Sequence, residues 1–224
     1  MLNHSGLIVF DMDSTLISIE CIDEIANLLG QRDAVAAITE QAMRGEIDFA
    51  ASLTQRVALL EGIDVSLFNR LFTPIPFTQG AQALIDYCKS KHWYCVVVSG
   101  GFTWFTGRVA EQLGLDMHVA NELEIHNGKL TGKVSGAIVD GHKKAQVLQN
   151  LKQQLPANAP VVAVGDGAND QWMLQAADLG VAFCAKPVLQ EVADVSVSQP
   201  DLALIINELK GRFEPMLVAT LVGV

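Results

Sequence analysis

Four short runs of consecutive apolar residues set the strongest limit on how this chain can fold. They cover residues 7–10, 94–98, 161–164 and 179–183, and a polar or glycine-rich segment follows each of them. Runs of this length without alternation are typical of strands buried on both faces. Between them, residues 81–90, 104–113, 143–155 and 171–177 carry apolar side chains at helical spacing. This alternation predicts an α/β fold, in which helices cover both faces of a doubly wound parallel sheet.

Two insertions interrupt the alternation. Residues 18–73 contain helical patterns over residues 21–29, 33–44, 48–60 and 64–71, with Pro74 and Pro76 after them. Because this block follows the first strand, we expect it to form a helical cap domain over the carboxyl end of the sheet. The core domain would then comprise residues 1–17 and 74–224. The second insertion, residues 121–138, has alternating segments around Asn127-Gly128, which is a strong signal of a β-hairpin.

The charge balance limits the possible partners. Lys and Arg total 15 and Asp and Glu total 25, giving a formal net charge of −10. Such a surface repels phosphate backbones, so nucleic acid is not an expected partner. An anionic substrate would therefore need a local positive site, made from a few basic side chains, a cation and helix N-termini.

The sequence lacks the patterns typical of a secreted or membrane-spanning protein. The four cysteines contain no CxxC pair, the first apolar run is too short for a signal peptide, and no run approaches membrane-spanning length. We therefore expect a cytoplasmic protein without a membrane partner. Residues 215–224 form an apolar tail, expected to dock on the protein or to contact another subunit. The sequence does not define an oligomeric state.

Chemically active residues follow three of the predicted strands. They are Asp11-Met12-Asp13-Ser14-Thr15 after the first, Ser99-Gly100-Gly101 after the second and Asp166-Gly167-Ala168-Asn169-Asp170 after the third. Lys143 and Lys144 begin the helix that leads to the third. Since ligands bind at the carboxyl ends of such strands, these groups are expected to meet at one edge. Gathered carboxylates repel unless a cation lies among them, and oxygen ligands favour Mg²⁺ over Zn²⁺.

Each motif has a structural explanation when it stands alone. Asp11 to Thr15 could form a capping turn, although a calcium loop is excluded because Leu16 and Ile22 replace the required Gly and Glu. Ser-Gly-Gly and Gly-Asp-Gly are common tight turns, and Lys144 could be a solvated helix charge. Their combination, each after a strand, favours a functional site.

Together these segments resemble the haloacid dehalogenase-like phosphohydrolases. Within that superfamily the chain is most similar to the phosphoserine phosphatases, through Glu20, Met43-Arg44-Gly45-Glu46, Phe49 and Arg56-Val57. The similarity runs from about residue 7 to residue 209. It implies a Rossmann-like core with a cap, and Mg²⁺-dependent hydrolysis of free phosphoserine in the last step of serine biosynthesis. The sequence leaves no room for the N-terminal regulatory domain that some members carry, and the apolar tail matches no family feature.

The resemblance also implies a role for each residue of the core site. Asp11 would be the nucleophile that forms an aspartyl-phosphate, and Asp13 would protonate the leaving alkoxide and later activate water. Asp11, Asp166 and the backbone carbonyl of Asp13 would hold Mg²⁺. The phosphate oxygens would be bound by Ser99, the Gly100 amide, Lys144 and Asn169. Asp170 would lie behind them and orient the metal site or Lys144.

Recognition of the serine moiety would fall to the cap. Glu20 would bind the substrate ammonium, Arg56 the carboxylate, and Met43 and Phe49 would form a lid that excludes water. From the residues alone, a surface ion pair for Arg56 and ordinary cap core for Met43 and Phe49 stay open. Two rival functions also stay open. One is hydrolysis or transfer of phosphate from another small phosphomonoester. The other is a non-catalytic module that binds a phosphoamino acid, against which the presence of Asp11 and Asp13 argues.

Overall fold

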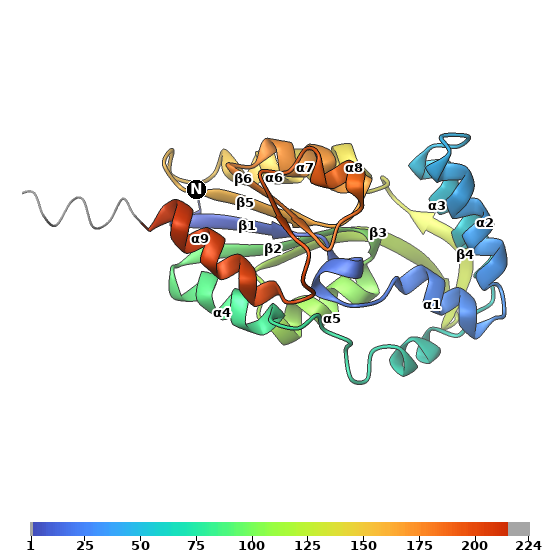
Figure 1. Cartoon of the computed structure of the whole chain (residues 1–224). Helices are drawn as coiled ribbons and strands as arrows, with labels where there is room; N and C mark the ends of the chain where they lie inside the picture. Colours follow the sequence, from blue (N-terminus) through green and yellow to red (C-terminus); the bar gives the residue numbers. More distant parts are fainter. Residues whose placement is uncertain (1, 215–224) are drawn as a thin grey trace, which may run out of the picture.

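A computed structural model describes residues 2–214 and centres on a seven-stranded sheet (Figure 1). The strand order is β4-β3-β2-β1-β5-β6-β7. All neighbouring strands are parallel except β3 and β4, which are antiparallel. The bounds are β1 (Gly6–Phe10), β2 (Trp93–Phe102), β3 (Met117–His126), β4 (Lys129–Ser135), β5 (Val161–Gly165), β6 (Leu179–Phe183) and β7 (Val195–Val197). The predicted apolar tail lies outside the described residues.

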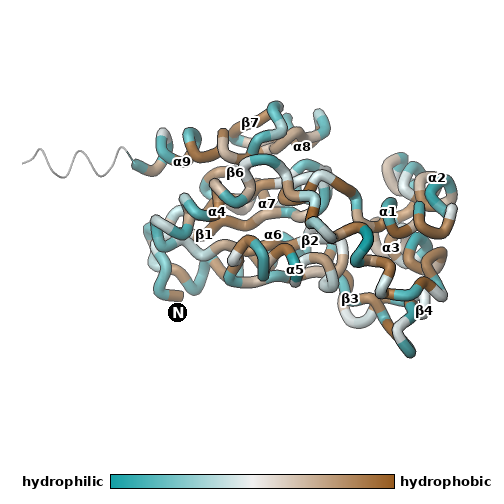
Figure 2. The backbone as a smooth tube through the Cα atoms, turned by 90° about the horizontal axis from the view of Figure 1, so that it is seen from below, coloured by the Kyte–Doolittle hydropathy of each residue, from teal (hydrophilic) through white to brown (hydrophobic). Residues whose placement is uncertain are grey.

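Helices cover both faces of this sheet, as predicted. One face carries α4 (Ala81–Ser90), α5 (Thr103–Leu113) and α9 (Ile205–Phe213), and the other α6 (Gly141–Lys152), α7 (Gln171–Ala176) and α8 (Pro187–Gln190). Side chains of β1 alternate between the two apolar clusters, with Ile8 and Phe10 in one and Leu7 and Val9 in the other. Figure 2 shows β1 as a hydrophobic stretch among helices of mixed hydropathy. The continuous apolar runs therefore reflect burial on both faces.

The helices of residues 18–73 lie beyond the carboxyl end of β1 (Figure 1). They are α1 (Cys21–Leu28), α2 (Arg32–Met43) and α3 (Phe49–Ala58), followed by a short 3₁₀ turn (Val65–Arg70) where a regular helix was expected. Phe68 and Phe72 pack against Phe105 of α5, with ring centroids 5.1 and 4.7 Å away. This contact joins the returning chain to the core. The division into a core and a cap domain stays a prediction.

The predicted hairpin is present and reaches the cap helices. Asn127 and Gly128 have φ of 49° and 76°, as a tight turn between β3 and β4 requires. The Gly62 N–H donates to the Leu130 carbonyl over 2.8 Å, and the Leu130 N–H donates to Ile63 over 2.9 Å. The hairpin thus extends the backbone pairing to the segment after α3.

Several elements differ from the sequence-based expectation. β3 begins at Met117 and pairs with β2, so the first hairpin arm is also a strand of the main sheet. α6 begins at Gly141 rather than residue 143, because the Asp140 side chain accepts the Lys143 N–H and caps the helix. β7, α8 and α9 were not predicted, since the first two are too short for a clear periodic signal. Among residues 2–214, no helix combines the length and hydrophobicity needed to cross a membrane.

Candidate active site

A buried lysine joins two carboxylates at the carboxyl end of the sheet. Lys144 has no exposed surface, and its Nζ donates to Asp11 Oδ1 over 2.7 Å and to Asp170 Oδ1 over 2.8 Å. Asp11 directly follows β1, Asp170 lies in the loop after β5, and Lys144 projects from the first turn of α6. The alternative of a solvated helix charge for Lys144 is therefore wrong.

The electrostatics of this cluster leave surplus negative charge. Burial alone lowers the pKa of Lys144, but the charges of Asp11 and Asp170 outweigh it and raise that pKa. Burial raises the pKa of Asp11 well above its ordinary value; Asp170 adds to this and Lys144 opposes it. Burial, and then the Asp170 charge, raise the pKa of Asp166 to about 6. Three carboxylates thus lie close together, and the charges of Lys144 and, at Asp166, Lys186 only partly offset the rise in the pKa values of Asp11 and Asp166.

The same carboxylates could hold a metal ion. Asp11, Asp166 and Asp170 each offer an oxygen within 4.8 Å of the others. These are hard oxygen donors, which suit Mg²⁺ or Ca²⁺ better than Zn²⁺. Asp170 is already engaged, since its Oδ2 accepts the N–H groups of Asp166 and Gly167, each over 3.2 Å. Asp11 and Asp166 therefore have more free coordination capacity than Asp170, and the donor set fits a divalent cation.

Asp13 lies in the turn between β1 and α1. Its Oδ1 accepts the Cys21 N–H over 2.9 Å, and a Cβ atom on Gly101 would lie 2.6 Å from its Oδ2. This second oxygen therefore faces the carboxyl-terminal part of β2. Burial raises the pKa of Asp13, with the Cys21 hydrogen bond acting in the opposite direction. A carboxyl group whose pKa is raised in this way is a candidate for proton transfer.

Ser99 and its two glycines lie near the carboxyl end of β2, where its pairing with β3 shifts register. Ser99 is fully buried, and its Oγ accepts the Gly101 N–H over 2.8 Å. A Cβ atom on Gly100 would lie 2.9 Å from the ring of Phe49, the first residue of α3. The glycines leave the backbone accessible to a ligand, and a cap residue covers it.

The loop after β5 brings two further predicted residues to the same edge. Asp166 is half-buried, and its Oδ1 accepts the Thr15 hydroxyl over 3.4 Å. Asn169 is also half-buried, and its Oδ1 would lie 2.5 Å from a Cβ atom on Gly167. The two loops after β1 and β5 are thus joined through Thr15 and Asp166.

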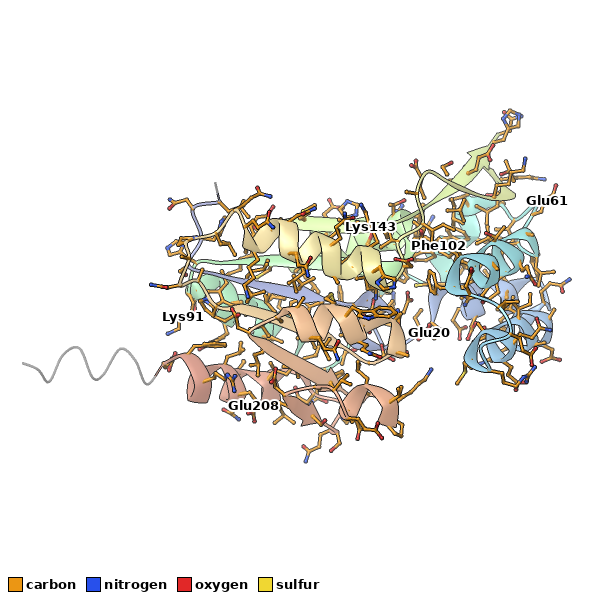
Figure 3. All side chains as sticks on the ribbon, turned by 90° about the horizontal axis from the view of Figure 1, so that it is seen from above. Glu20, Glu61, Lys91, Phe102, Lys143 and Glu208 are labelled. Atoms are coloured by element: carbon orange, nitrogen blue, oxygen red, sulfur yellow. The ribbon has the colours of Figure 1, made fainter. Side chains whose placement is uncertain are left out.

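Glu20 and Arg56 are the two charged residues that the sequence assigned to the cap side of the site. Glu20 lies at the junction between the sheet end and the cap helices (Figure 3), and its Oε1 accepts the Ser14 hydroxyl over 2.6 Å. Burial of the carboxyl group, and then the charge of Asp13, raise the pKa of Glu20 to about 7. Arg56 on α3 is half-buried, where burial lowers its pKa and the carboxylates of Asp23, Glu20 and Asp13 oppose that effect. The arginine therefore faces the acidic side of the site.

Met43 and Phe49 differ in placement. Phe49 contacts the Gly100 backbone, where a lid residue would be expected. Met43 ends α2 and is 69% exposed, so the alternative that it belongs to the cap core is wrong. Its role as a lid stays a prediction.

Two buried polar residues at this edge were not predicted as site residues. Thr15 is the first, and it lies in the Asp11 to Thr15 motif that the sequence placed directly after the first strand. Asn121 is the second, on β3, and donates from Nδ2 to the Gly100 carbonyl over 2.8 Å. A single asparagine within an alternating strand carries no sequence signal of such a contact.

This geometry agrees with comparisons against known proteins. The haloacid dehalogenase-like hydrolase family model matches residues 8–175. The chain belongs to this family. A phosphoserine phosphatase of Idiomarina loihiensis is 58% identical over 212 residues, covering 94% of this chain and 96% of the relative.

Solved structures support the same assignment. A phospho-aspartyl intermediate analogue of phosphoserine phosphatase matches with a TM-score of 0.84 and 39% identity, over 92% of this chain and 99% of the other. A substrate-bound phosphoserine phosphatase complex matches with the same TM-score, identity and coverage. The fold prediction, a Rossmann-like sheet of the haloacid dehalogenase type, is thereby confirmed.

Proposed function

We propose that this protein hydrolyses free phosphoserine to serine and inorganic phosphate through an aspartyl-phosphate, an acyl phosphate formed on Asp11. The observation that carries the proposal is the buried Asp11–Lys144 pair beside Asp13, at the sheet edge of a chain 58% identical to a phosphoserine phosphatase. The reaction would be the last step of serine biosynthesis. The anionic surface makes this edge, with Lys144 and Arg56, the expected binding place for a phosphorylated amino acid.

In the first step, an Asp11 oxygen attacks phosphorus and the bond to the serine oxygen breaks. Asp13, whose free oxygen faces the Gly101 backbone, donates a proton to the departing alkoxide. A serine alkoxide is a poor leaving group, so this proton lowers the barrier substantially. In the second step Asp13 takes a proton from water as the water attacks phosphorus of the aspartyl-phosphate, and the bond from phosphorus to the Asp11 oxygen breaks, which releases phosphate and restores Asp11.

Other residues of the core hold the phosphoryl group during both steps. Ser99, the Gly100 amide, Lys144 and Asn169 bind its oxygens, and Asp170 fixes the Lys144 ammonium from behind. Mg²⁺, held by Asp11, Asp166 and the Asp13 carbonyl, would neutralise phosphate charge and reduce its repulsion from Asp11. Mg²⁺ rather than Ca²⁺ is proposed because Ca²⁺ takes more oxygen ligands at longer distances.

The cap would select the amino acid. Glu20 pairs with the substrate ammonium and Arg56 with its carboxylate, while Phe49 shields the Gly100 backbone from water. Met43 would close the outer side of the lid. Since the four cysteines are free in the described structure, a reducing cytoplasmic location is proposed as well.

A substrate panel tests the proposal. Phosphate release would be measured from phosphoserine, phosphothreonine and phosphoethanolamine, with and without Mg²⁺, and with homoserine added as a possible acceptor. We expect phosphoserine to have the highest kcat/KM, with water as the main acceptor. Asp11→Asn serves as the control, since it keeps the shape and removes the nucleophile. A higher kcat/KM on another ester would contradict the substrate, and phosphohomoserine as the main product would contradict hydrolysis.

A further inference from the structure

Asn121 joins three segments of the active-site edge through one buried side chain. It lies on β3 and is 1% exposed. Its Nδ2 donates to the Gly100 carbonyl and its Oδ1 accepts the Val139 N–H, each over 2.8 Å. Both ends of the amide are thus hydrogen-bonded to backbone, one within β2 and the other just before α6.

The need for such a contact follows from the register of the sheet. β2 and β3 pair at Val98 and Val119, and again at Phe102 and Asn121, with a register shift between the two points. Ser99, Gly100 and Gly101 of β2 therefore lie opposite the single β3 residue Ala120 and form a bulged loop within the strand. A bulge of this kind interrupts the regular ladder of backbone hydrogen bonds. The Asn121 side chain supplies a donor to the Gly100 carbonyl within the interrupted stretch.

The bond also fixes the hydroxyl of Ser99. The Gly100 carbonyl and the Gly101 N–H belong to one planar peptide unit. Asn121 holds its carbonyl end, and its N–H end donates to Ser99 Oγ over 2.8 Å. Because that bond occupies a lone pair of Ser99 Oγ, the hydroxyl proton stays available to a phosphate oxygen.

The other end of Asn121 reaches the segment that begins α6. Val139 is buried, and the next residue, Asp140, caps the helix that carries Lys144. One side chain therefore links the loop that holds Ser99 to the start of the helix that holds Lys144.

We propose that Asn121 is a positioning residue that sets the geometry of the phosphate-binding loop through the Gly100–Gly101 peptide. Only an amide of this length meets both needs. Aspartate keeps an acceptor for Val139 but faces the Gly100 carbonyl with a second acceptor, and alanine leaves both backbone groups without their partner. The inference rests on the proposed function, because it concerns the loop assigned to the phosphate.

The test compares Asn121→Asp and Asn121→Ala with a control at the opposite end of the same strand pair. In the control, Asp116→Ala, the lost carboxylate accepts the Cys95 N–H over 2.7 Å, far from the site loops. The readouts are the melting temperature, kcat/KM on phosphoserine and nitrophenyl phosphate, and the inhibition constant of inorganic phosphate. We expect either Asn121 variant to lose about 10- to 100-fold in kcat/KM on both esters and to bind phosphate more weakly.

The control should lower the melting temperature while leaving kcat/KM and phosphate inhibition unchanged. If both Asn121 variants instead behave like Asp116→Ala, the residue is only structural and the inference fails. If wild-type protein hydrolyses nitrophenyl phosphate but not phosphoserine, the proposed substrate fails, while the Asn121 comparison on nitrophenyl phosphate still decides the inference.

A double-mutant cycle tests the route through Ser99. Asn121→Asp is expected to cost much less in a Ser99→Ala background than in the wild type, because the hydroxyl that it positions is already gone. Equal costs in the two backgrounds would overturn the claim that Asn121 acts through the Ser99 hydroxyl.

Discussion

Residues of the site would act in different steps of the reaction, so their substitutions are expected to affect catalysis differently. Asp11 and Asp13 both belong to the turn after β1, but Asp11 is paired with Lys144 while Asp13 accepts the Cys21 N–H. A nucleophile must be ionised, and the Lys144 ammonium opposes the upward shift that burial and the Asp170 charge impose on the pKa of Asp11. A proton carrier must hold a proton, and burial raises the pKa of Asp13 against the Cys21 hydrogen bonds and the Lys144 charge.

Asp13→Asn should therefore harm substrates in proportion to how much their leaving group needs a proton. We expect a large loss of kcat/KM on phosphoserine and a clearly smaller loss on nitrophenyl phosphate, whose phenolate leaves without protonation. Steady-state assays of the variant on both esters check this, with Asp11→Asn as the control that should lose both. Losses of equal size for Asp13→Asn would count against its assignment as the acid.

Arg56→Ala is expected to affect only substrates with a carboxylate. Truncating one partner of a buried ion pair costs on the order of 2–5 kcal/mol, or about 30- to several-thousand-fold in kcat/KM. Phosphoserine should suffer this loss, whereas phosphoethanolamine, which lacks the carboxylate, should be nearly unaffected. Glu20→Gln provides the matched comparison, since it should weaken both ammonium-bearing substrates.

The losses of kcat/KM on phosphoserine and on phosphoethanolamine, compared with each other, decide the role of Arg56. Its Nε donates to the Ser52 carbonyl over 3.3 Å, and this bond within α3 is a contact through which Arg56 would contribute to the stability of the helix. An equal loss on phosphoserine and phosphoethanolamine would show that this contribution dominates.

At the scale of elements, the start of α6 matters most for the site. This helix positions Lys144, and its N-terminus is closed by the Asp140 side chain, which accepts the Lys143 N–H over 2.8 Å. Asn121 is hydrogen-bonded to the segment just before this helix, because its Oδ1 accepts the Val139 N–H. The order of the first turn of α6 is therefore coupled to the order of residues 99–101 of β2.

Asp140→Ala should loosen this turn. Loss of an N-cap costs about 1 kcal/mol, which corresponds to roughly 2–4 °C in melting temperature for a chain of this size. We also expect a fall in kcat/KM, because the Lys144 ammonium would be less well placed. Asp140→Ser, which retains a capping oxygen, is the control and should restore most of both quantities. If serine restores neither, capping is not what Asp140 contributes.

At the scale of the whole molecule, the protein concentrates negative charge where it must bind an anion. The chain carries a net charge of −10, and three carboxylates converge at the end of the sheet. The pKa of Asp166 is raised from 3.8 to about 6, so the folded protein binds this proton more tightly than the unfolded chain does. The corresponding stability is present below pH ~4 and is lost as the pH rises through 6. Above that pH, a bound cation would offset the cost.

Asp166→Asn should therefore stabilise the cation-free protein while removing its response to metal. In chelator at pH 7.5 we expect the variant to melt a few degrees above wild type, because one repelling charge is gone. Adding Mg²⁺ should raise the melting temperature of wild type but not that of the variant. Thermal melts at pH 5 and 7.5, with and without Mg²⁺, check both parts. A variant that is less stable than wild type in chelator would show that Asp166 is not under electrostatic strain.

The sequence by itself determined the sheet and the gathering of its strand-end motifs. Apolar runs such as residues 161–164 are typical of strands buried on both faces, and parallel strands place Asp11, Ser99 and Asp166 at one edge of the sheet. The hairpin turn at Asn127-Gly128 is equally local, because it depends on backbone conformations that few residues adopt.

Only the tertiary structure decided the environment of each side chain. Lys144 is fully buried between two carboxylates and Met43 is exposed, although both lie on helices with ordinary polar neighbours in sequence. Asn121 contacts Gly100 because a register shift between β2 and β3 interrupts their ladder, and such a shift arises from pairing between strands rather than from either strand alone. Burial, ionisation and long-range hydrogen bonds depend on which segments meet in space, and a local sequence pattern contains no record of that meeting.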